Sequence, residues 1–159
     1  MCSGKSTVGK AFAEALGWDF LDTDELIEKQ EGMSVAEIFE KKGETYFRER
    51  ELEILKDLCN KKGLVISTGG GLGANPQALD LMKSSGLVVW LRVDFETFLS
   101  RCGGDKSRPL LKKGEKELRE LFESRSKVYG QAHLVLDGSK EAKALVDELR
   151  NIFINYASG

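Results

Sequence analysis

The sequence predicts an α/β fold of three layers, in which helices cover both faces of a central parallel sheet. The first observation behind this prediction is that short apolar segments alternate with segments of helical periodicity along the chain. The second is that polar clusters follow these apolar segments, as expected where the strands of a parallel sheet end beside a ligand. No internal repeat or linker divides the sequence, so its 159 residues predict a single domain over residues 1–159.

Four segments have the pattern of buried strands. Phe20-Leu21 leads directly into the acidic sequence Asp22-Thr23-Asp24, and the segment 64–67 leads into three glycines. The run 87–93 is the strongest strand pattern in the chain, and 134–136 is a shorter one. We expect the strands to be parallel, because helical segments separate them.

Helices are expected between these strands, and turn residues define several of their ends. Gly17 is typical of the residue that follows a helix, and Ser34 with Glu37 forms a capping box at the start of another. Apolar residues near the end of the chain keep a helical period, which favours a helix there over a further strand. The expected helical ranges are 8–16, 26–30, 35–41, 44–59, 76–82, 95–101, 116–129 and 140–153.

Composition excludes several classes of protein. The formal net charge is −2, so the chain as a whole has no general attraction for nucleic acid or for an anionic membrane. No apolar run is long enough to span a bilayer, and no signal peptide is recognisable. The three cysteines, an odd number without a Cys-x-x-Cys pair, fit a reducing compartment. We therefore expect a cytoplasmic protein.

The chain opens in the second half of a phosphate-binding P-loop. Gly4-Lys5-Ser6 matches the end of the pattern Gly-x-x-x-x-Gly-Lys-Ser/Thr, whereas the first glycine and the strand before it would precede Met1. In such a loop, backbone N–H groups and a helix N-terminus point at the phosphates, the lysine adds a cation and the hydroxyl ligates Mg²⁺. The motif favours binding of a nucleoside triphosphate, and the alternative is a solvated helix start.

Asp22 and Asp24 follow the first strand pattern at a spacing of two. In an extended strand this spacing places both side chains on the same side. Two carboxylates there could hold Mg²⁺ through water, or take a proton from a substrate hydroxyl. The alternative is that Asp24 only caps the helix that follows.

Cationic side chains recur near the same predicted edge, at Arg48, Arg50, Arg101, Arg108 and Arg125. A guanidinium group suits bidentate recognition of carboxylate or phosphate, although any one of these side chains could simply be solvated. The triplet 69–71 consists of glycine only, and ordering three glycines is costly in backbone entropy. We expect the triplet to allow close approach of the backbone to a ligand.

Together these motifs resemble those of the shikimate kinase family along nearly the whole chain. The resemblance depends on their order and spacing: Gly4 to Gly9, Phe20 to Asp24, Ile38-Phe39, Gly43-Glu44, Phe47-Arg48 with Glu51, Ser67 to Gly71, Arg108 to Leu111, and Arg125 with Tyr129. It implies a P-loop kinase fold of the nucleoside-monophosphate-kinase type, with a five-stranded sheet in the order 2-3-1-4-5.

The same resemblance implies an enzyme that phosphorylates the 3-hydroxyl of shikimate with ATP, a step toward chorismate and the aromatic amino acids. ATP would be the co-substrate and Mg²⁺ the cofactor. Neither nucleic acid nor a membrane would be a partner, and the protein would act as a monomer. Helices at about 24–60 would bind the substrate, and a lid at about 103–115 would close over the site and exclude water.

The resemblance also implies roles for individual residues. The residues that bind ATP would be Cys2, Ser3, Gly4, Lys5, Ser6, Thr7, Arg101 and Arg108. The residues that bind Mg²⁺ would be Ser6 and Asp22. The catalytic residues would be Asp24, as candidate base, with Lys5 and Arg108. The residues that bind the substrate would be Asp24, Arg48, Gly69, Gly70, Gly71 and Arg125. Glu51 would hold Arg48 in place.

Two features depart from the family pattern. Cys2 stands where the family usually has glycine, and its Cβ is tolerable if the local φ is negative. The first strand, which is central in the family sheet, is missing from this chain. Our hypothesis is that the natural chain is longer and that Met1 is an internal methionine, because the family often has methionine at this place in the loop.

Two other functions remain open. One is that of another small-metabolite kinase of the same fold, such as gluconate kinase, against which the arginines and the glycine triplet argue. The other is that of a non-catalytic relative that keeps the shikimate site and has a defective P-loop. We interpret His133, Trp18 and Trp90 as structural, and assign the cysteines no chemistry.

Overall fold

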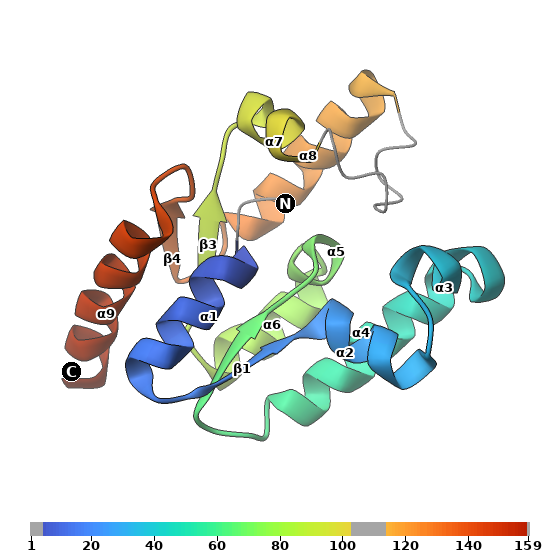
Figure 1. Ribbon diagram of the computed structural model, residues 1–159. Helices are drawn as coiled ribbons and strands as arrows, with labels where there is room; N and C mark the ends of the chain where they lie inside the picture. Colours follow the sequence, from blue (N-terminus) through green and yellow to red (C-terminus); the bar gives the residue numbers. More distant parts are fainter. Residues whose placement is uncertain (1–4, 103–113, 159) are drawn as a thin grey trace.

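The computed structural model describes residues 5–102 and 114–158 (Figure 1). Within these residues, helices alternate with short strands, so the α/β class predicted from the sequence is confirmed. In chain order the elements are α1 (Lys5–Leu16), β1 (Asp19–Asp22), α2 (Thr23–Glu31), α3 (Val35–Lys42), α4 (Glu44–Leu58), β2 (Leu64–Ser67), α5 (Gly70–Gly73), α6 (Pro76–Ser85), β3 (Val89–Arg92), α7 (Phe95–Cys102), α8 (Glu115–Tyr129), β4 (Leu134–Asp137) and α9 (Ala142–Ser158).

The strands form two parallel pairs. β1 pairs with β2, with Asp22 opposite Ser67, and β3 pairs with β4, with Val89 opposite Leu134. In the part of the chain that the structure describes, no strand joins β2 to β3, so the pairs are two separate two-stranded sheets. They correspond to the outer pairs 2-3 and 4-5 of the strand order expected for a P-loop kinase.

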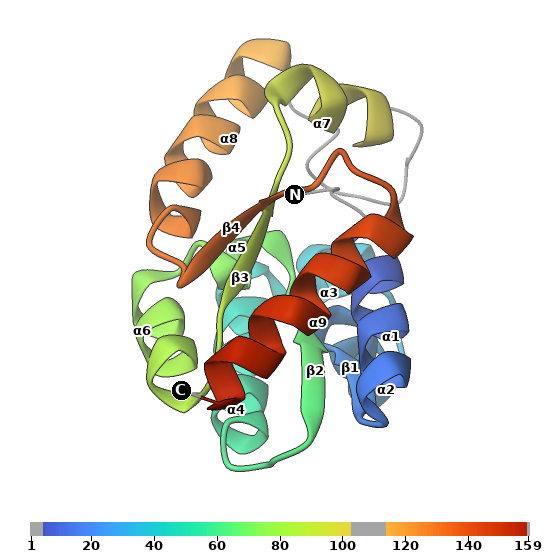
Figure 2. The same ribbon diagram turned by 90° about the vertical axis from the view of Figure 1, so that its left-hand side faces the viewer.

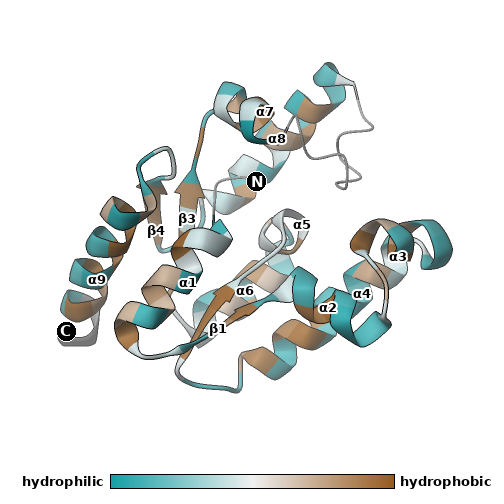
Figure 3. Cartoon of the chain, in the orientation of Figure 1, coloured by the Kyte–Doolittle hydropathy of each residue, from teal (hydrophilic) through white to brown (hydrophobic). Residues whose placement is uncertain are grey.

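Helices pack on both faces of these strands (Figure 2). On one face, Val8 of α1 lies in a buried cluster with Leu91 of β3 and Leu149 of α9. On the other face, Ile54 of α4 is buried in a cluster that Ile66 of β2 joins. Figure 3 colours β1 and β3 as hydrophobic, which is typical of parallel strands covered on both sides.

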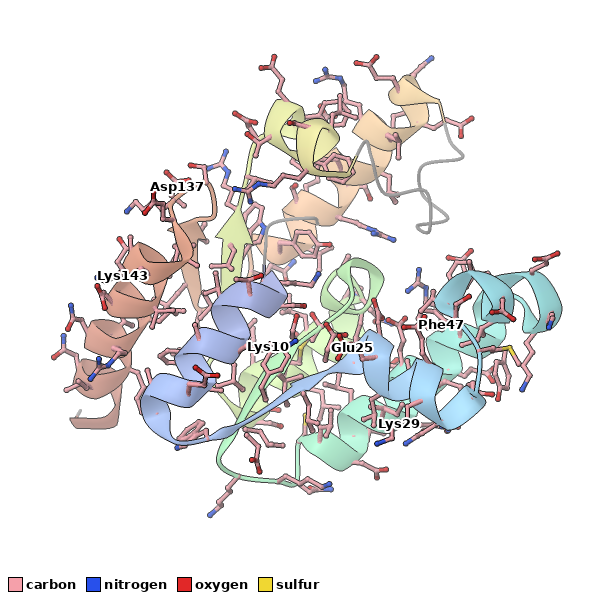
Figure 4. All side chains as sticks on the ribbon, in the orientation of Figure 1. Lys10, Glu25, Lys29, Phe47, Asp137 and Lys143 are labelled. Atoms are coloured by element: carbon pink, nitrogen blue, oxygen red, sulfur yellow. The ribbon has the colours of Figure 1, made fainter. Side chains whose placement is uncertain are left out.

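The helices α2, α3 and α4 form a packed unit beside β1. Ile27, Ile38 and Phe47, one from each helix, are almost fully buried in one cluster, and Phe47 is labelled in Figure 4. Polar contacts also join the helices, because Glu31 at the end of α2 accepts hydrogen bonds from Lys42 Nζ (2.9 Å) and Tyr46 Oη (2.6 Å). We call this group of helices the α2–α4 unit.

Several predicted element ends are confirmed. Gly17 follows α1 with a φ of +70°, a conformation that glycine adopts without strain. Ser34 and Glu37 make both hydrogen bonds of the capping box at the start of α3. The last described segment is helical through Ile154, as its apolar period predicts. None of the described helices is long and apolar enough to cross a membrane.

Other bounds differ from the sequence prediction. α2 begins at Thr23 instead of residue 26, because the Asp22 side chain accepts hydrogen bonds from the backbone N–H groups of the first turn. β3 is shorter than the predicted range 87–93, and Val93 already packs in the cluster of α7 and α8. The glycine triplet forms part of a short helix, because α5 begins at Gly70.

Candidate active site

A hydroxyl and a carboxylate meet where α1 begins and β1 ends. The Ser6 hydroxyl donates a hydrogen bond to Asp22 Oδ2 (2.9 Å), and Ser67 Oγ lies 3.5 Å from Ser6 Oγ. The register explains this meeting, because Asp22 and Ser67 end their strands opposite one another and side chains alternate between the faces of a sheet. The predicted metal residues Ser6 and Asp22 thus lie together, and Ser67 joins them.

The spacing of Asp22 and Asp24 predicts that both lie in one strand, and this prediction is wrong. The strand ends at Asp22 and α2 begins at Thr23, so Asp24 belongs to the first helical turn. Asp22 Oδ1 accepts hydrogen bonds from the N–H groups of Asp24 (2.9 Å) and Glu25 (3.2 Å). The capping role considered for Asp24 therefore belongs to Asp22.

The glycine triplet is approached closely by side chains of the chain itself. A Cβ added to Gly69 would stand 2.7 Å from Oδ1 of Asp24, and one added to Gly71 would stand 2.5 Å from Cζ of Arg48. The Gly69 N–H also donates a hydrogen bond to Thr23 Oγ1 (3.2 Å), whose side chain is fully buried. The close approach expected of a ligand is thus already made by Asp24 and Arg48, two of the predicted substrate residues.

Arg48 is held by a buried carboxylate. Its Nη1 donates a 2.6 Å hydrogen bond to Oε1 of Glu51, a residue that is 1% exposed. Burial raises the pKa of Glu51, and the guanidinium of Arg48 opposes this shift. Asp24 and Arg125 also influence the pKa of Glu51, so Arg48, Asp24 and Arg125 all lie within electrostatic reach of this carboxyl group. Glu51 therefore positions Arg48, as the resemblance predicts.

Arg125 and Tyr129 bring α8 to the same place. Burial lowers the pKa of Arg125, and the neighbouring cation Arg48 lowers it further. The Tyr129 hydroxyl donates a hydrogen bond to the carbonyl oxygen of Gly70 (2.6 Å). Figure 1 shows α5, which begins with this glycine, between α8 and α4. Arg48 and Arg125 thus both lie near Glu51, and a guanidinium group suits a carboxylate or phosphate ligand.

The other predicted residues are placed as follows. Lys5 and Thr7 lie in the first turn of α1, next to Ser6. Arg101 lies in the last turn of α7, where its Nη1 donates a hydrogen bond to the Gly138 carbonyl oxygen (3.1 Å) beyond β4. Outside the described residues lie Cys2, Ser3, Gly4, Arg108 and the predicted lid 103–115 apart from its last two residues.

Arg50 does not join the other arginines. It forms ion pairs with Glu31 (3.2 Å) and Glu53, and it contacts Gln30, so its partners belong to the α2–α4 unit. Arg48 and Arg50 are two positions apart on α4, and this spacing turns their side chains to different sides of a helix. The grouping of Arg50 with the anion-binding arginines is therefore wrong.

The residues interpreted as structural make contacts of the kind that this interpretation expects. His133 Nδ1 accepts a hydrogen bond from the Val88 N–H (3.0 Å) at the start of the β3–β4 pair. The Trp18 ring packs on Phe153 with centroids 5.3 Å apart, and the Trp90 ring lies 5.6 Å from that of Tyr129.

Three residues that hold this region together received no role from the sequence. Thr23 and Ser67 are buried hydroxyls, Thr23 at the start of α2 directly after β1 and Ser67 at the end of β2. That these two strand ends lie side by side can be recognised only once the strand pairing is known. Tyr129 stands four residues after Arg125. This spacing places both on one face of a helix, so the sequence could have indicated that Tyr129 lies beside Arg125.

Comparison with known proteins shows the family. The family model described as shikimate kinase matches residues 1–153. The chain belongs to the shikimate kinase family. The shikimate kinase of Aquifex aeolicus is 52% identical over 149 residues, which cover 94% of this chain and 89% of that protein. That of Persephonella marina is 49% identical, covering 94% of this chain and 92% of that protein.

Solved structures agree with this family. The structure of shikimate kinase from Aquifex aeolicus matches with a TM-score of 0.90 at 50% identity, covering 99% of this chain and 94% of that one. Shikimate kinase from Acinetobacter baumannii, in complex with shikimate, matches with a TM-score of 0.92 at 38% identity. The match covers 98% of this chain and 89% of that one. A gluconokinase from Sinorhizobium meliloti, at 18% identity and a TM-score of 0.57, shares only the fold. The family therefore favours shikimate kinase over gluconate kinase.

Proposed function

We propose that this chain transfers the γ-phosphoryl group of ATP to the 3-hydroxyl of shikimate. The observation that carries the proposal is that Arg48 and Arg125 lie within electrostatic reach of one another in a member of this family, beside the glycine turn. Shikimate is an anion that also carries hydroxyls. It needs cationic groups for its carboxylate, which Arg48 and Arg125 would supply, and an acceptor for its hydroxyls, which Asp24 would supply.

Mg²⁺ is the metal that we propose for the phosphate end of the site. The donor set fits this ion, because the Ser6 hydroxyl, the Asp22 carboxylate and the Ser67 hydroxyl offer only hard oxygen ligands. Ser6 would ligate the ion directly and Asp22 through water. When bound, Mg²⁺ would neutralise negative charge on the phosphates of ATP. Lys5 in the first turn of α1 would add a further positive charge there.

Asp24 would act as the general base on the 3-hydroxyl. It lies in the first turn of α2, where the helix dipole stabilises a carboxylate, and its Oδ1 faces the backbone at Gly69. Phosphoryl transfer depends mainly on positioning and on charge around the transferring group. Arg101 would lie against adenine, and Arg108 from the lid would reach the transferring phosphate.

A single chain would suffice for this reaction. We therefore propose that the protein acts as a monomer. The free thiol of Cys59 is compatible with the reducing cytoplasm that we propose as its setting.

A coupled assay of ADP release tests the proposed function. With ATP and Mg²⁺, ADP release should depend on shikimate and saturate with it, and gluconate should not replace shikimate. Arg125→Lys keeps the positive charge and removes the planar fork, so it should raise KM for shikimate about tenfold or more. Arg150→Lys, on the exposed side of α9, is the matched control and should not change KM. ADP release that is independent of shikimate would contradict the proposal. If no ADP is released at all, calorimetric titration with ATP would identify a non-catalytic relative by its lack of nucleotide binding.

A further inference from the structure

Tyr129 joins the end of α8 to the glycine turn, a distant part of the chain. Its hydroxyl donates a 2.6 Å hydrogen bond to the carbonyl oxygen of Gly70, across 59 residues of sequence. Its ring lies 5.6 Å from the Trp90 ring, measured between centroids, and a Cβ added to Gly73 would stand 3.3 Å from its Cε1. Both the ring and the hydroxyl are therefore fixed in place.

The hydrogen bond fixes more than one carbonyl group. The C=O of Gly70 and the N–H of Gly71 belong to one planar peptide unit, so holding the oxygen also sets the direction of the N–H and the position of the Gly71 Cα. The guanidinium of Arg48 lies against that Cα, in the space that a Cβ would occupy. Tyr129 thus determines the backbone surface against which Arg48 lies.

Tyr129 also belongs to the helix that carries Arg125. The two residues are four positions apart, which places them on the same face of α8. The positive charge of Arg125 acts on the Tyr129 hydroxyl, so the two side chains lie within electrostatic reach. One hydroxyl therefore connects the helix of one guanidinium group to the turn that supports the other.

We propose that Tyr129 is a positioning residue, which sets the spacing between Arg48 and Arg125 and so the fit of the substrate carboxylate. It acts through the Gly70–Gly71 peptide, and the inference depends on the proposed function. Burial raises the pKa of Tyr129 to about 12, so its hydroxyl remains a hydrogen-bond donor throughout the neutral range.

The variant Tyr129→Phe tests this role, because it removes the hydroxyl and keeps the packed ring. KM for shikimate should rise roughly three- to tenfold, the effect of losing one hydrogen bond, while KM for ATP stays within about twofold. The melting temperature should change little, since the ring contacts remain. Tyr46→Phe is the matched control, because that hydroxyl also donates a 2.6 Å hydrogen bond, to Glu31, within the α2–α4 unit. It should leave both KM values unchanged.

Calorimetric titration of wild type and Tyr129→Phe with shikimate separates this inference from the proposed function. Weaker binding by the variant supports the positioning role, whether or not the wild type turns over. Equal binding by an active wild type and by the variant would overturn the inference and leave the proposed function standing. A loss of stability without a change in affinity would show a structural role only and would also overturn it. Lack of binding by both proteins would overturn both proposals.

Discussion

The guanidinium of Arg48 occupies the space where a side chain at position 71 would begin. A Cβ added to Gly71 would stand 2.5 Å from Cζ of Arg48, well inside the contact distance of two carbon atoms. Glu51 Oε1 accepts a 2.6 Å hydrogen bond from Nη1 of this guanidinium and so holds it in place. Arg48 can therefore keep this position only because residue 71 has no side chain.

Gly71→Ala should displace Arg48 and weaken binding of the acid substrate. The methyl group would push aside the end of a flexible side chain, so stability should fall by less than about 1 kcal/mol. KM for shikimate should rise tenfold or more, because the misplaced guanidinium loses its bidentate geometry. Gly86→Ala is the control, since nothing lies within 4 Å of its added Cβ. Equal KM values for the two variants would contradict this account of Gly71.

Asp24→Asn should reduce turnover far more than nucleotide binding. An amide retains the size of the carboxylate and cannot accept the proton of the 3-hydroxyl, so kcat should fall at least about 100-fold. The affinity for ATP, measured by calorimetry, should stay within about twofold of the wild type. Asp80→Asn removes an exposed carboxylate on α6 and should have no effect. Full turnover in Asp24→Asn would remove Asp24 as the base.

Glu51 should make stability depend on pH in an unusual direction. Burial raises its pKa in the folded protein, so ionisation of Glu51 lowers stability as the pH rises through this raised value. Glutamine cannot ionise. The free energy of unfolding of Glu51→Gln, relative to wild type, should therefore increase between about pH 4 and pH 7 in urea titrations. A difference that stays constant with pH would contradict the raised pKa.

Glu31→Gln should show the opposite trend. Hydrogen bonds from Tyr46 and then Lys42 lower the pKa of Glu31, so its ionised form stabilises the folded protein and this contribution is lost as the pH falls through the lowered value. The variant should be less stable than wild type at neutral pH, and the difference should shrink in acid. The same urea titrations measure both variants. If the free energies of unfolding of both change with pH in the same direction, the contacts of Glu31 and Glu51 do not determine this pH dependence.

Gly9→Ala should destabilise the contact between α1 and β1. Its Cβ would stand 2.6 Å from Cε1 of Phe20, a residue of β1. Overpacking of this kind costs roughly 1–3 kcal/mol of the free energy of unfolding. Adding Phe20→Leu should recover part of that loss, because the two sites are in direct contact. If the double variant loses as much free energy of unfolding as the two single variants together, the Phe20 ring is not what excludes a side chain at position 9.

The sequence predicts the elements of this fold well where local chemistry defines them. The helix caps at Gly17 and Ser34 are as predicted, because each depends on a few adjacent residues. The start of α2 is not, because Asp22 ends a strand and caps a helix at the same time, so the strand period stops before Asp24. The sequence therefore mispredicts the start of α2, because one side chain, that of Asp22, belongs to a strand and also caps the helix that follows.

The site is partly predictable for a similar reason. Ser6, Asp22, Arg48 and Arg125 stand in recognisable motifs, and the structure brings them into two adjoining groups. Arg50 shows the limit of composition, since its partners depend on which side of α4 it faces. The contact of Tyr129 with Gly70 joins residues far apart in sequence, so it follows only from the packing of α8 on α5.

Identification of the product by phosphorus NMR is the most direct test of the proposed phosphoryl transfer to shikimate. The wild-type chain is incubated with ATP, Mg²⁺ and shikimate, and ADP is measured in the same sample. We expect one phosphate monoester on the 3-hydroxyl of shikimate for each ADP released. A sample that contains no phosphorylated shikimate, or that carries the phosphate on a different hydroxyl, would contradict the proposed transfer.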